Sequence, residues 1–386
     1  MLKNKKLVMI PGPTPTVEPI QNQMARETVS FKDPDFVKDF KELVVELKEL
    51  LGTKGECMVV AGTGTLAMEM AIANTTKQDD NVLIVSHGFF GDRFVDMCKR
   101  RGLNTDVLAS EWGQTVPVGE IEKKLGEKTY QAITVTHADT STGTCAPVAK
   151  IGKVVRKFED TLFILDGVCA TAAEPEYVDQ MGIDVLLTGS QKAFGVAPGL
   201  AILWAGPHAL KRRTSLGTIP DSYFDFEKWI PIMHDPFKYW GTPPVNLIWA
   251  LKESVKLIKA EGLENRYRRH KNDARAIQAA LEAIGFKILA EPHCRAVTLS
   301  NVIYPEGVDD QEFRKLLVEE GVVVAAGLAD YAGKAFRLGH MGNIDKHIIV
   351  STLAAIERAL HRAGYKVKFG ETIRVYMETL LLSESA

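Results

Sequence analysis

The sequence predicts an α/β protein with a large domain built on a mostly parallel sheet and a smaller C-terminal α+β domain. Short apolar runs alternate with helix-like segments between residues 57 and 204, which is typical of parallel strands joined by crossover helices. From about residue 260 onward, short strand-like runs and helical segments follow a different pattern. We therefore expect an N-terminal arm (1–16), a large domain (17–260) and a small C-terminal domain (261–386).

The large domain is expected to contain seven strands, each a short and mostly apolar run. The strands are Cys57–Val60, Val82–Val85, Thr105–Leu108, Ile133–Thr136, Thr161–Leu165, Val185–Leu187 and Leu200–Trp204. Helices are expected at Glu18–Thr28, Asp35–Leu51, Leu66–Asn74, Asp92–Gly102 and Val148–Phe158. The arm contains Pro11-Gly12-Pro13-Thr14-Pro15, which cannot form a helix or a central strand. Residues 205–244 are rich in aromatic residues and proline, and we expect them to be irregular.

The remaining elements lead into the small domain and form it. Long helices are expected at Val245–Glu261 and Asn265–Ile284, followed by a helix at Asp309–Glu320 and a final helix at Lys346–Ala363. Strands are expected at Phe286–Ala290, Ala296–Asn301, Val322–Ala325 and Ala335–Gly339.

The composition disfavours several classes of protein. The 386 residues include 46% hydrophobic residues and carry a formal net charge of −2, so no charge excess attracts the chain to nucleic acid or anionic lipid. No apolar run approaches the roughly 18–20 residues that cross a bilayer, and Leu7–Ile10 is too short for the core of a signal peptide. The five cysteines lack the spacing of a zinc site or disulfide framework. We expect a cytoplasmic protein with reduced thiols and without a metal, nucleic-acid or membrane partner.

Lys192 follows one expected strand and precedes the glycine- and proline-rich loop Gly195–Gly199. Loops at strand ends carry the chemistry of α/β proteins, and a lysine partly removed from water is a nucleophile towards carbonyls. Asp166 ends the preceding strand 26 residues earlier, the spacing of one crossover between parallel neighbours. The pair is either a plain salt bridge or the pair that pyridoxal phosphate requires, a lysine for the Schiff base and a carboxylate for the ring nitrogen.

Gly62-Thr63-Gly64-Thr65 lies between an expected strand and an expected helix. Such a turn exposes backbone N–H groups at a helix N-terminus, where a phosphate binds readily. The same residues fit the loose dinucleotide fingerprint, which requires an acidic residue at the end of the next strand. That strand ends in Ser86-His87-Gly88. The turn is therefore a site for a single phosphate or an ordinary strand-to-helix connection.

With these motifs, the chain resembles the class V aminotransferases, which are fold-type I pyridoxal-phosphate enzymes, over nearly its whole length. The strongest motif is Gly189-Ser190-Gln191-Lys192-Ala193, with Pro198-Gly199 after it. The resemblance implies that Lys192 and Asp166 are the catalytic residues and that pyridoxal 5′-phosphate is the cofactor. It implies that Lys192 forms the Schiff base and then moves the proton at the substrate.

The resemblance also implies the remaining contacts of the site. It implies that Phe90 stacks on the cofactor ring, that Thr140 contacts the phenolic oxygen, and that Arg337 binds the substrate carboxylate. The phosphate contacts that it implies come from Gly64, Thr65 and Gln191 of the same subunit and from Tyr239 and Thr242 of a neighbouring one. A homodimer with shared active sites is therefore expected.

Three positions depart from the family pattern. Many relatives carry Trp at the position of Phe90 and His at the position of Gly241, and they often have Ser-Leu-Gly where this chain has Cys169-Ala170-Thr171-Ala172. The resemblance leaves the pocket size and the contact at Gly241 open.

The likeness is strongest to the alanine–glyoxylate, serine–pyruvate and serine–glyoxylate aminotransferases. It implies a transaminase that moves the amino group of alanine or serine to glyoxylate or pyruvate by a ping-pong mechanism. No second arginine stands out in the motifs that line the site, and a dicarboxylate substrate would require a second cation. Small amino acids are therefore expected as donors.

Other activities stay open as alternatives. Relatives include ureidoglycine–glyoxylate and 2-aminoethylphosphonate–pyruvate aminotransferases. Cysteine desulfurases of this fold usually have His before the lysine, where this chain has Gln191, and Cys294 precedes Arg337 by 43 residues. A nicotinamide oxidoreductase would lack its acidic residue, and an inactive binding module is disfavoured because every cofactor position is filled.

Overall fold

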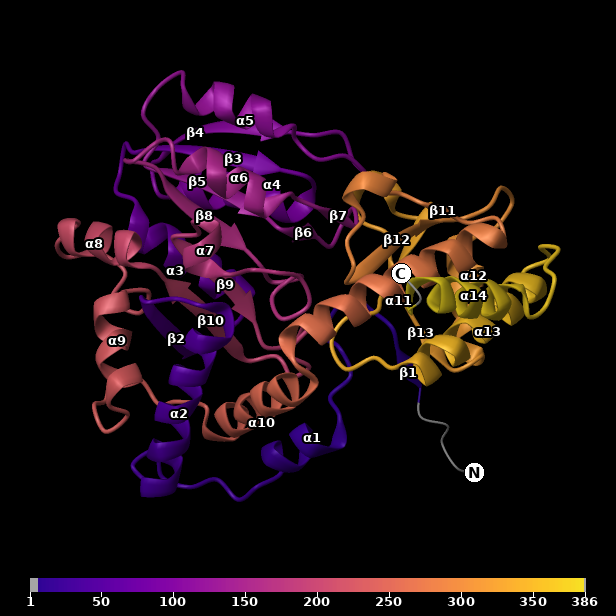
Figure 1. Cartoon of the computed structure of the whole chain (residues 1–386), viewed down its shortest axis with the longest axis horizontal. Helices are drawn as coiled ribbons and strands as arrows, with labels where there is room; N and C mark the ends of the chain where they lie inside the picture. Colours follow the sequence, from indigo (N-terminus) through magenta and orange to yellow (C-terminus); the bar gives the residue numbers. More distant parts are fainter. Residues whose placement is uncertain (1–5, 385–386) are drawn as a thin grey trace.

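A seven-stranded sheet forms the centre of the large lobe (Figure 1). The computed structural model describes residues 6–384, so the first five residues of the predicted arm and the last two of the predicted C-terminal domain lie outside the described part. The sheet order is β2-β10-β9-β8-β5-β3-β4, and every neighbouring pair is parallel except those of β10, which is antiparallel to β2 and β9. The strands are β2 (Glu56–Ala61), β3 (Asn81–Ser86), β4 (Asn104–Ala109), β5 (Ala132–Thr136), β8 (Leu162–Asp166), β9 (Val185–Gly189) and β10 (Leu200–Ala205). The predicted seven-stranded, mostly parallel sheet is confirmed.

The pattern of burial explains why these runs form the sheet. All residues of β5, β8, β9 and β10 are buried, as expected for strands covered on both faces. The edge strand β4 consists of exposed and partly buried residues. Helices join the strands: α3 (Gly64–Thr75), α4 (Phe89–Arg100), α5 (Val118–Leu125), α6 (Val148–Val155) and α7 (Val178–Met181), with a small ribbon of β6 (Ala138–Asp139) and β7 (Thr144–Cys145).

The segment 205–244 is more regular than the sequence predicted. It contains two helices, α8 (Pro207–Ser215) and α9 (Phe226–His234). A proline starts α8, and the side chain of Asp225 caps α9 by accepting from the N–H of Glu227. Pro231 lies inside α9, and an internal proline is ordinarily a sign against a helix. The prediction of an irregular segment was wrong for these residues.

The described part of the N-terminal arm pairs with the smaller lobe of the same chain. Strand β1 (Leu7–Val8) pairs in parallel with β13 (Val322–Val323) in the smaller lobe, and Figure 1 shows β1 beside that lobe. Beyond the arm, α1 (Glu18–Met24), α2 (Pro34–Leu51) and α10 (Val245–Glu261) pack together at the lower edge of the large lobe in the view of Figure 1.

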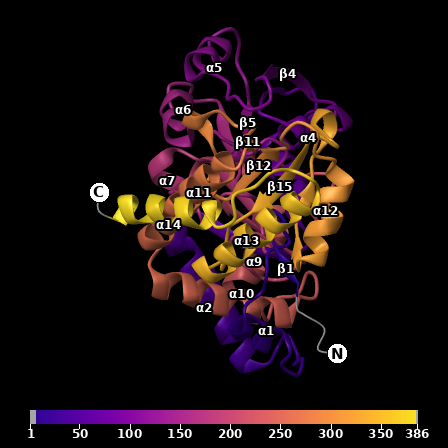
Figure 2. The same cartoon turned by 90° about the vertical axis from the view of Figure 1, so that its right-hand side faces the viewer.

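The smaller lobe is built on a four-stranded antiparallel sheet of order β11-β12-β15-β14. Its strands are β11 (Lys287–Ile288), β12 (Leu299–Ile303), β14 (Ala325–Ala326) and β15 (Ala335–Gly339); its helices are α11 (Leu263–Ala283), α12 (Asp310–Glu319), α13 (Lys346–Arg362) and α14 (Glu371–Glu384), with short 3₁₀ turns at Pro292–Cys294 and Ala329–Tyr331. Figure 2 shows α12, α13 and α14 in front of this sheet. Helix α14 follows the helix that the sequence analysis took to be the last.

Buried apolar side chains form two clusters. One is drawn from residues 20–258, together with Ala296, Leu299 and Met341, and the other from residues 276–376 together with Met9. The domain boundary at residue 260 stays a prediction. Within residues 6–384, no helix combines the length and the apolar character needed to pass through a bilayer.

Candidate active site

Lys192 is the third residue after the end of β9, at the carboxyl edge of the sheet. Its Nζ donates a hydrogen bond to the carbonyl of Pro11, and its own carbonyl accepts one from Thr14 Oγ1 at 2.7 Å. A Cβ on Gly12 would lie 2.7 Å from Lys192 Cε and Nζ, so the arm packs directly against this side chain. Lys192 and Asp166 line the same cavity, which follows from β8 and β9 being parallel neighbours.

Asp166 is buried, with 3% of its surface exposed. Its Oδ1 accepts a hydrogen bond from the N–H of Val168 at 2.9 Å, whereas Oδ2 accepts none from the described residues. Burial raises the pKa of this carboxyl to about 7, and the charges of Asp139 and Glu176 add to the rise. The bond from Val168 and the charge of Lys192 oppose it. A cation next to the free Oδ2 would stabilise the ionised form of this buried carboxyl group.

The N-terminus of α3 opens into this cavity at Gly64 and Thr65. No side chain caps the helix, and the N–H groups of these two residues have no acceptor among the described residues. A Cβ on Gly64 would lie 2.8 Å from Val168 Cγ2, so the glycine lets the helix start close to the loop after β8. Gln191 faces the same space, and its buried Oε1 has no hydrogen-bond partner. Unpaired N–H groups at a helix N-terminus attract an anion.

Asp139 holds the start of α4, from which Phe90 reaches the cavity. The Oδ2 atom of this buried carboxylate accepts from the N–H groups of Phe90 at 3.1 Å and Gly91 at 3.2 Å. Its Oδ1 accepts from the N–H and hydroxyl of Ser141. A Cβ on Gly88 would lie 2.9 Å from Asp139 Cγ and Oδ1. Phe89 and Phe90, which lie between Gly88 and Gly91, therefore form the start of α4, and Asp139 on β6 holds this start in place.

Arg337 reaches the neighbourhood of Thr140 from β15 in the smaller lobe. Its Nε donates to the carbonyl of Ala326 at 2.8 Å, and its Nη1 to the carbonyl of Thr140 at 3.5 Å. The structure gives it no carboxylate partner among the described residues, and burial lowers its pKa against the influence of Cys169 and Asp139. Thr140 Oγ1 lies 3.1 Å from Cys169 Sγ, which places the departure at Cys169 in the cavity wall.

Tyr239 and Thr242 do not line this cavity. Both are outside it, on the segment between α9 and α10, where Tyr239 Oη lies 3.3 Å from Thr242 Oγ1. Tyr239 is 61% exposed and packs against Phe31, with a ring-centroid distance of 5.3 Å. Within one chain, the structure thus brings seven of the ten predicted site residues together around the cavity and places Arg337 beside it.

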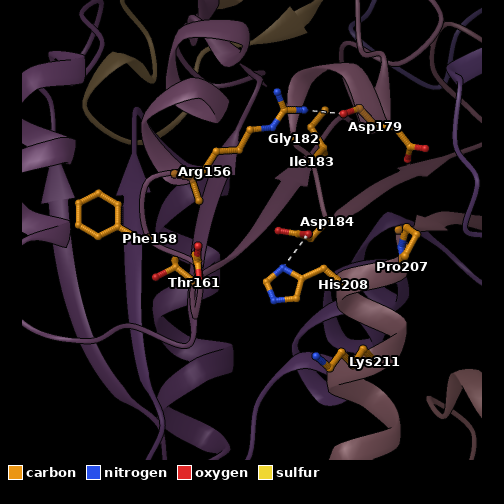
Figure 3. Close-up of a pocket in the computed structure, with 13 residues that line it drawn as sticks. Arg156, Phe158, Thr161, Asp179, Gly182, Ile183, Asp184, Pro207, His208 and Lys211 are labelled. Carbon is orange, nitrogen blue, oxygen red and sulfur yellow. Dashed lines mark hydrogen bonds and ion pairs between the residues drawn. The ribbon is translucent and has the colours of Figure 1, made fainter.

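A second pocket lies at the opposite edge of the sheet, where β8 and β9 begin (Figure 3). Several of its polar groups already have partners within the chain. Arg156 donates to the carbonyl of Asp179 at 2.5 Å, and His208 Nδ1 lies 3.2 Å from Asp184 Oδ1. None of the predicted site residues lines it. Ligands of open α/β sheets bind at the carboxyl ends of the strands, which favours the cavity around Lys192 as the active site.

Comparison with protein families decides the family. The model of the class V aminotransferases matches residues 20–336. The chain belongs to this family. It is 36% identical to an uncharacterized aminotransferase of Methanocaldococcus jannaschii over 98% of both chains. It is 31% identical to the L-aspartate–glyoxylate aminotransferase of Paracoccus denitrificans, over 96% of this chain and 95% of the relative. The crystal structure of an alanine–glyoxylate aminotransferase from Nostoc sp. matches with a TM-score of 0.88 and 32% identity, over 93% of this chain and 96% of that one.

These findings confirm that this class V aminotransferase is an enzyme of the transaminase type with the fold-type I architecture. The names of these last two proteins share glyoxylate and differ in the amino donor.

The sequence analysis missed one charged residue of this aminotransferase's cavity, Arg93. The expectation that no second arginine lines the site was therefore wrong. Arg93 lies three residues after Phe90 on α4, and residues with this spacing share one face of a helix. Because the helix was expected to begin only at Asp92, this relation to Phe90 was not visible.

Proposed function

We propose that this aminotransferase uses pyridoxal 5′-phosphate and moves the amino group of a small amino acid, alanine or serine, to glyoxylate or pyruvate. One observation carries the proposal: a lysine amine and an incompletely paired buried carboxylate share a cavity with an uncapped helix N-terminus. The site residues proposed for the cofactor are those expected from the sequence: Gly64, Thr65, Phe90, Thr140, Asp166, Gln191 and Lys192, with Tyr239 and Thr242 from a partner subunit.

The polar groups of the cavity fit this cofactor. The free N–H groups at Gly64 and Thr65 suit a phosphate. The free Oδ2 of Asp166 suits a protonated ring nitrogen, since a cation there offsets the effect of burial that raises the carboxyl pKa. The unpaired Gln191 Oε1 and Thr136 Oγ1 also border this space. A bound polar molecule would give these atoms partners.

When bound, pyridoxal phosphate supplies an aldehyde that condenses with amines and a ring that withdraws electrons from the substrate Cα. The chain's own residues supply the rest. Asp166 keeps a proton on the ring nitrogen, and Lys192 takes up and returns the proton at the substrate Cα. Arg337 holds the α-carboxylate, because its planar fork matches a carboxylate bidentately. Phe90 supplies a flat apolar wall for the ring.

The central experiment replaces Lys192. We expect Lys192→Ala and Lys192→Arg to fold, to lose turnover, and to lose the covalent attachment of the cofactor that borohydride reduction leaves on the wild-type peptide. Lys150→Ala, an exposed lysine on α6, should keep both and serves as the control. Near wild-type transamination by Lys192→Ala would overturn the assignment of the catalytic lysine.

The donor preference is a separate part of the proposal. The charges that act on Arg337 come from Cys169 and Asp139 and include no cation of the described residues, and Arg93 is hydrogen-bonded to Thr65, at the α3 N-terminus. Together these observations favour alanine or serine, although one relative is named for aspartate. A panel of donors against glyoxylate and pyruvate tests this, with kcat/KM as the measure. If aspartate or glutamate exceeds both alanine and serine, the small-donor proposal fails and the aminotransferase assignment is untouched.

The desulfurase alternative gains no support from the positions of the cysteines. That reaction requires a thiol on a mobile loop near the substrate. Cys294 is buried, and its Sγ lies 3.3 Å from the carbonyl of Gly113. Cys169, the cysteine in the cavity wall, is 2% exposed, and its Sγ is hydrogen-bonded to Thr140 Oγ1.

A further inference from the structure

Arg93 presents a guanidinium at the end of the cavity where α3 begins. Its Nη1 donates a hydrogen bond to Thr65 Oγ1 at 3.0 Å. Its Cζ lies 4.9 Å from the centre of the Phe90 ring and 5.5 Å from that of Phe89. Two aromatic faces and one hydroxyl therefore hold the cation in place. No carboxylate of the described residues forms an ion pair with it, in contrast to Arg100 and Arg101 further along the same chain segment.

The charged groups that line the cavity indicate the role of the Arg93 cation. The charged side chains among the described residues that line it are Arg93, Asp166 and Lys192. A phosphate monoester brings between one and two negative charges at neutral pH, whereas the protonated ring nitrogen of the proposed function balances Asp166. Lys192 is committed to the chemistry. Arg93 is thus the one other cation of this lining that is available to balance a phosphate.

We propose that Arg93 is a phosphate-binding residue for the cofactor, acting together with the N–H groups of Gly64 and Thr65. This rests on the proposed function, since it assumes that pyridoxal phosphate occupies the cavity. A guanidinium forms charge-assisted and often bidentate hydrogen bonds to phosphate oxygens. The bond to Thr65 keeps it aimed at the α3 N-terminus, so it needs little reordering when the phosphate arrives.

The competing role is recognition of a second carboxylate on the substrate. The position of Arg93 argues against it, because the proposed α-carboxylate residue, Arg337, is held by the carbonyls of Thr140 and Ala326. Arg93 is held instead by the hydroxyl at the α3 N-terminus. The two guanidiniums are therefore attached to different walls of the site.

The test compares two ligands that differ only in the phosphate. Dissociation constants of pyridoxal 5′-phosphate and of pyridoxal are measured by absorbance on the apo forms of wild type, Arg93→Met, Arg93→Lys and Arg100→Met. We expect Arg93→Met to bind pyridoxal phosphate about 10- to 100-fold more weakly, the range of a lost charged hydrogen bond, with pyridoxal binding nearly unchanged. Arg93→Lys keeps the positive charge but not the planar guanidinium, so its dissociation constant for pyridoxal phosphate should lie between those of wild type and Arg93→Met. Arg100→Met, on the exposed side of the same helix, should match wild type.

Inorganic phosphate provides a second readout that needs no cofactor. It should raise the melting temperature of the wild-type and Arg100→Met apoenzymes, and raise that of Arg93→Met much less. Equal weakening of pyridoxal phosphate and pyridoxal by Arg93→Met would mean that Arg93 only supports Phe90 and Thr65, and would overturn the proposal. Unchanged binding with a raised KM for aspartate would assign it to a substrate carboxylate instead, and unchanged behaviour throughout would also overturn it. If wild type fails to bind pyridoxal phosphate, the proposed function itself fails.

Discussion

The carboxyl group of Asp166 makes the stability of the apoenzyme depend on pH. Burial raises its pKa from 3.8 to about 7, so the folded chain holds this proton more tightly than the unfolded chain. The stabilisation is complete below about pH 4 and is lost as the pH rises towards 7. Asp166→Asn cannot ionise and keeps an oxygen for the N–H of Val168. We expect the free energy of unfolding of Asp166→Asn to rise relative to that of wild type between pH 4 and 7, by up to about 4 kcal/mol.

Urea unfolding of both apoenzymes at several pH values measures this difference, because contributions from titrating groups that do not interact with Asp166 cancel in the comparison. A difference that stays constant across this range would show that Asp166 is already ionised in the empty site. The same variant in the presence of cofactor should have lost most of its turnover.

At the residue scale, the sequence predicted the position of a residue best where that position follows from a strand end. Lys192 and Asp166 were predicted from two apolar runs, which imply two parallel neighbouring strands. Arg93 was not found, because its place depends on the turn at which α4 begins, and a tertiary carboxylate, Asp139, fixes that turn.

At the element scale, the pair Arg213–Asp225 ties α8 to the start of α9. Arg213 is 2% exposed, and its Nε and Nη2 donate to the two Asp225 oxygens at 2.9 and 2.8 Å. Removing one member of a buried pair leaves the other charge without a partner, which costs about 3–5 kcal/mol. We expect Arg213→Met to lower the free energy of unfolding by about 3 kcal/mol, and Lys211→Met, at an exposed position of α8, by less than about 0.5 kcal/mol.

Denaturant unfolding of the variants measures these changes. The double variant Arg213→Met with Asp225→Asn should recover much of the loss, since neither charge then remains buried and the Asn side-chain oxygen still caps α9. If the double variant is as unstable as Arg213→Met alone, packing and not the ion pair is the source of the effect.

Three of the helices that were not predicted from the sequence, α8, α9 and α14, depend on contacts with distant parts of the chain. Helix α9 carries an internal proline, and α8 is mostly polar with a proline at its start. Tertiary contacts such as the Arg213–Asp225 pair stabilise them. Helix α14 lies against α11, so what holds it is a helix about a hundred residues earlier, which periodicity alone does not reveal.

At the scale of the whole molecule, the single chain leaves aromatic side chains uncovered on the α9–α10 connection. Phe237 is 48% exposed, Tyr239 61% and Trp240 37%, and Phe89 at the start of α4 is 44% exposed. Exposed aromatic clusters of this kind mark surfaces for protein association. Tyr239 and Thr242 lie outside their own chain's cavity, so the proposed role of both residues at the phosphate requires a second copy.

A hybrid dimer tests whether the sites are shared. Lys192→Ala and the double variant Tyr239→Ala with Thr242→Ala should each be nearly inactive alone. If Tyr239 and Thr242 serve the partner's site, a hybrid of the two has one site with both changes and one with none. Random pairing in an equal mixture makes half of the dimers hybrids, each with one intact site of two, so activity should return to about a quarter of wild type. Residues that serve their own subunit would leave no intact site in the hybrid, so activity that stays flat on mixing, although sedimentation shows that subunits exchange, would contradict the shared-site dimer.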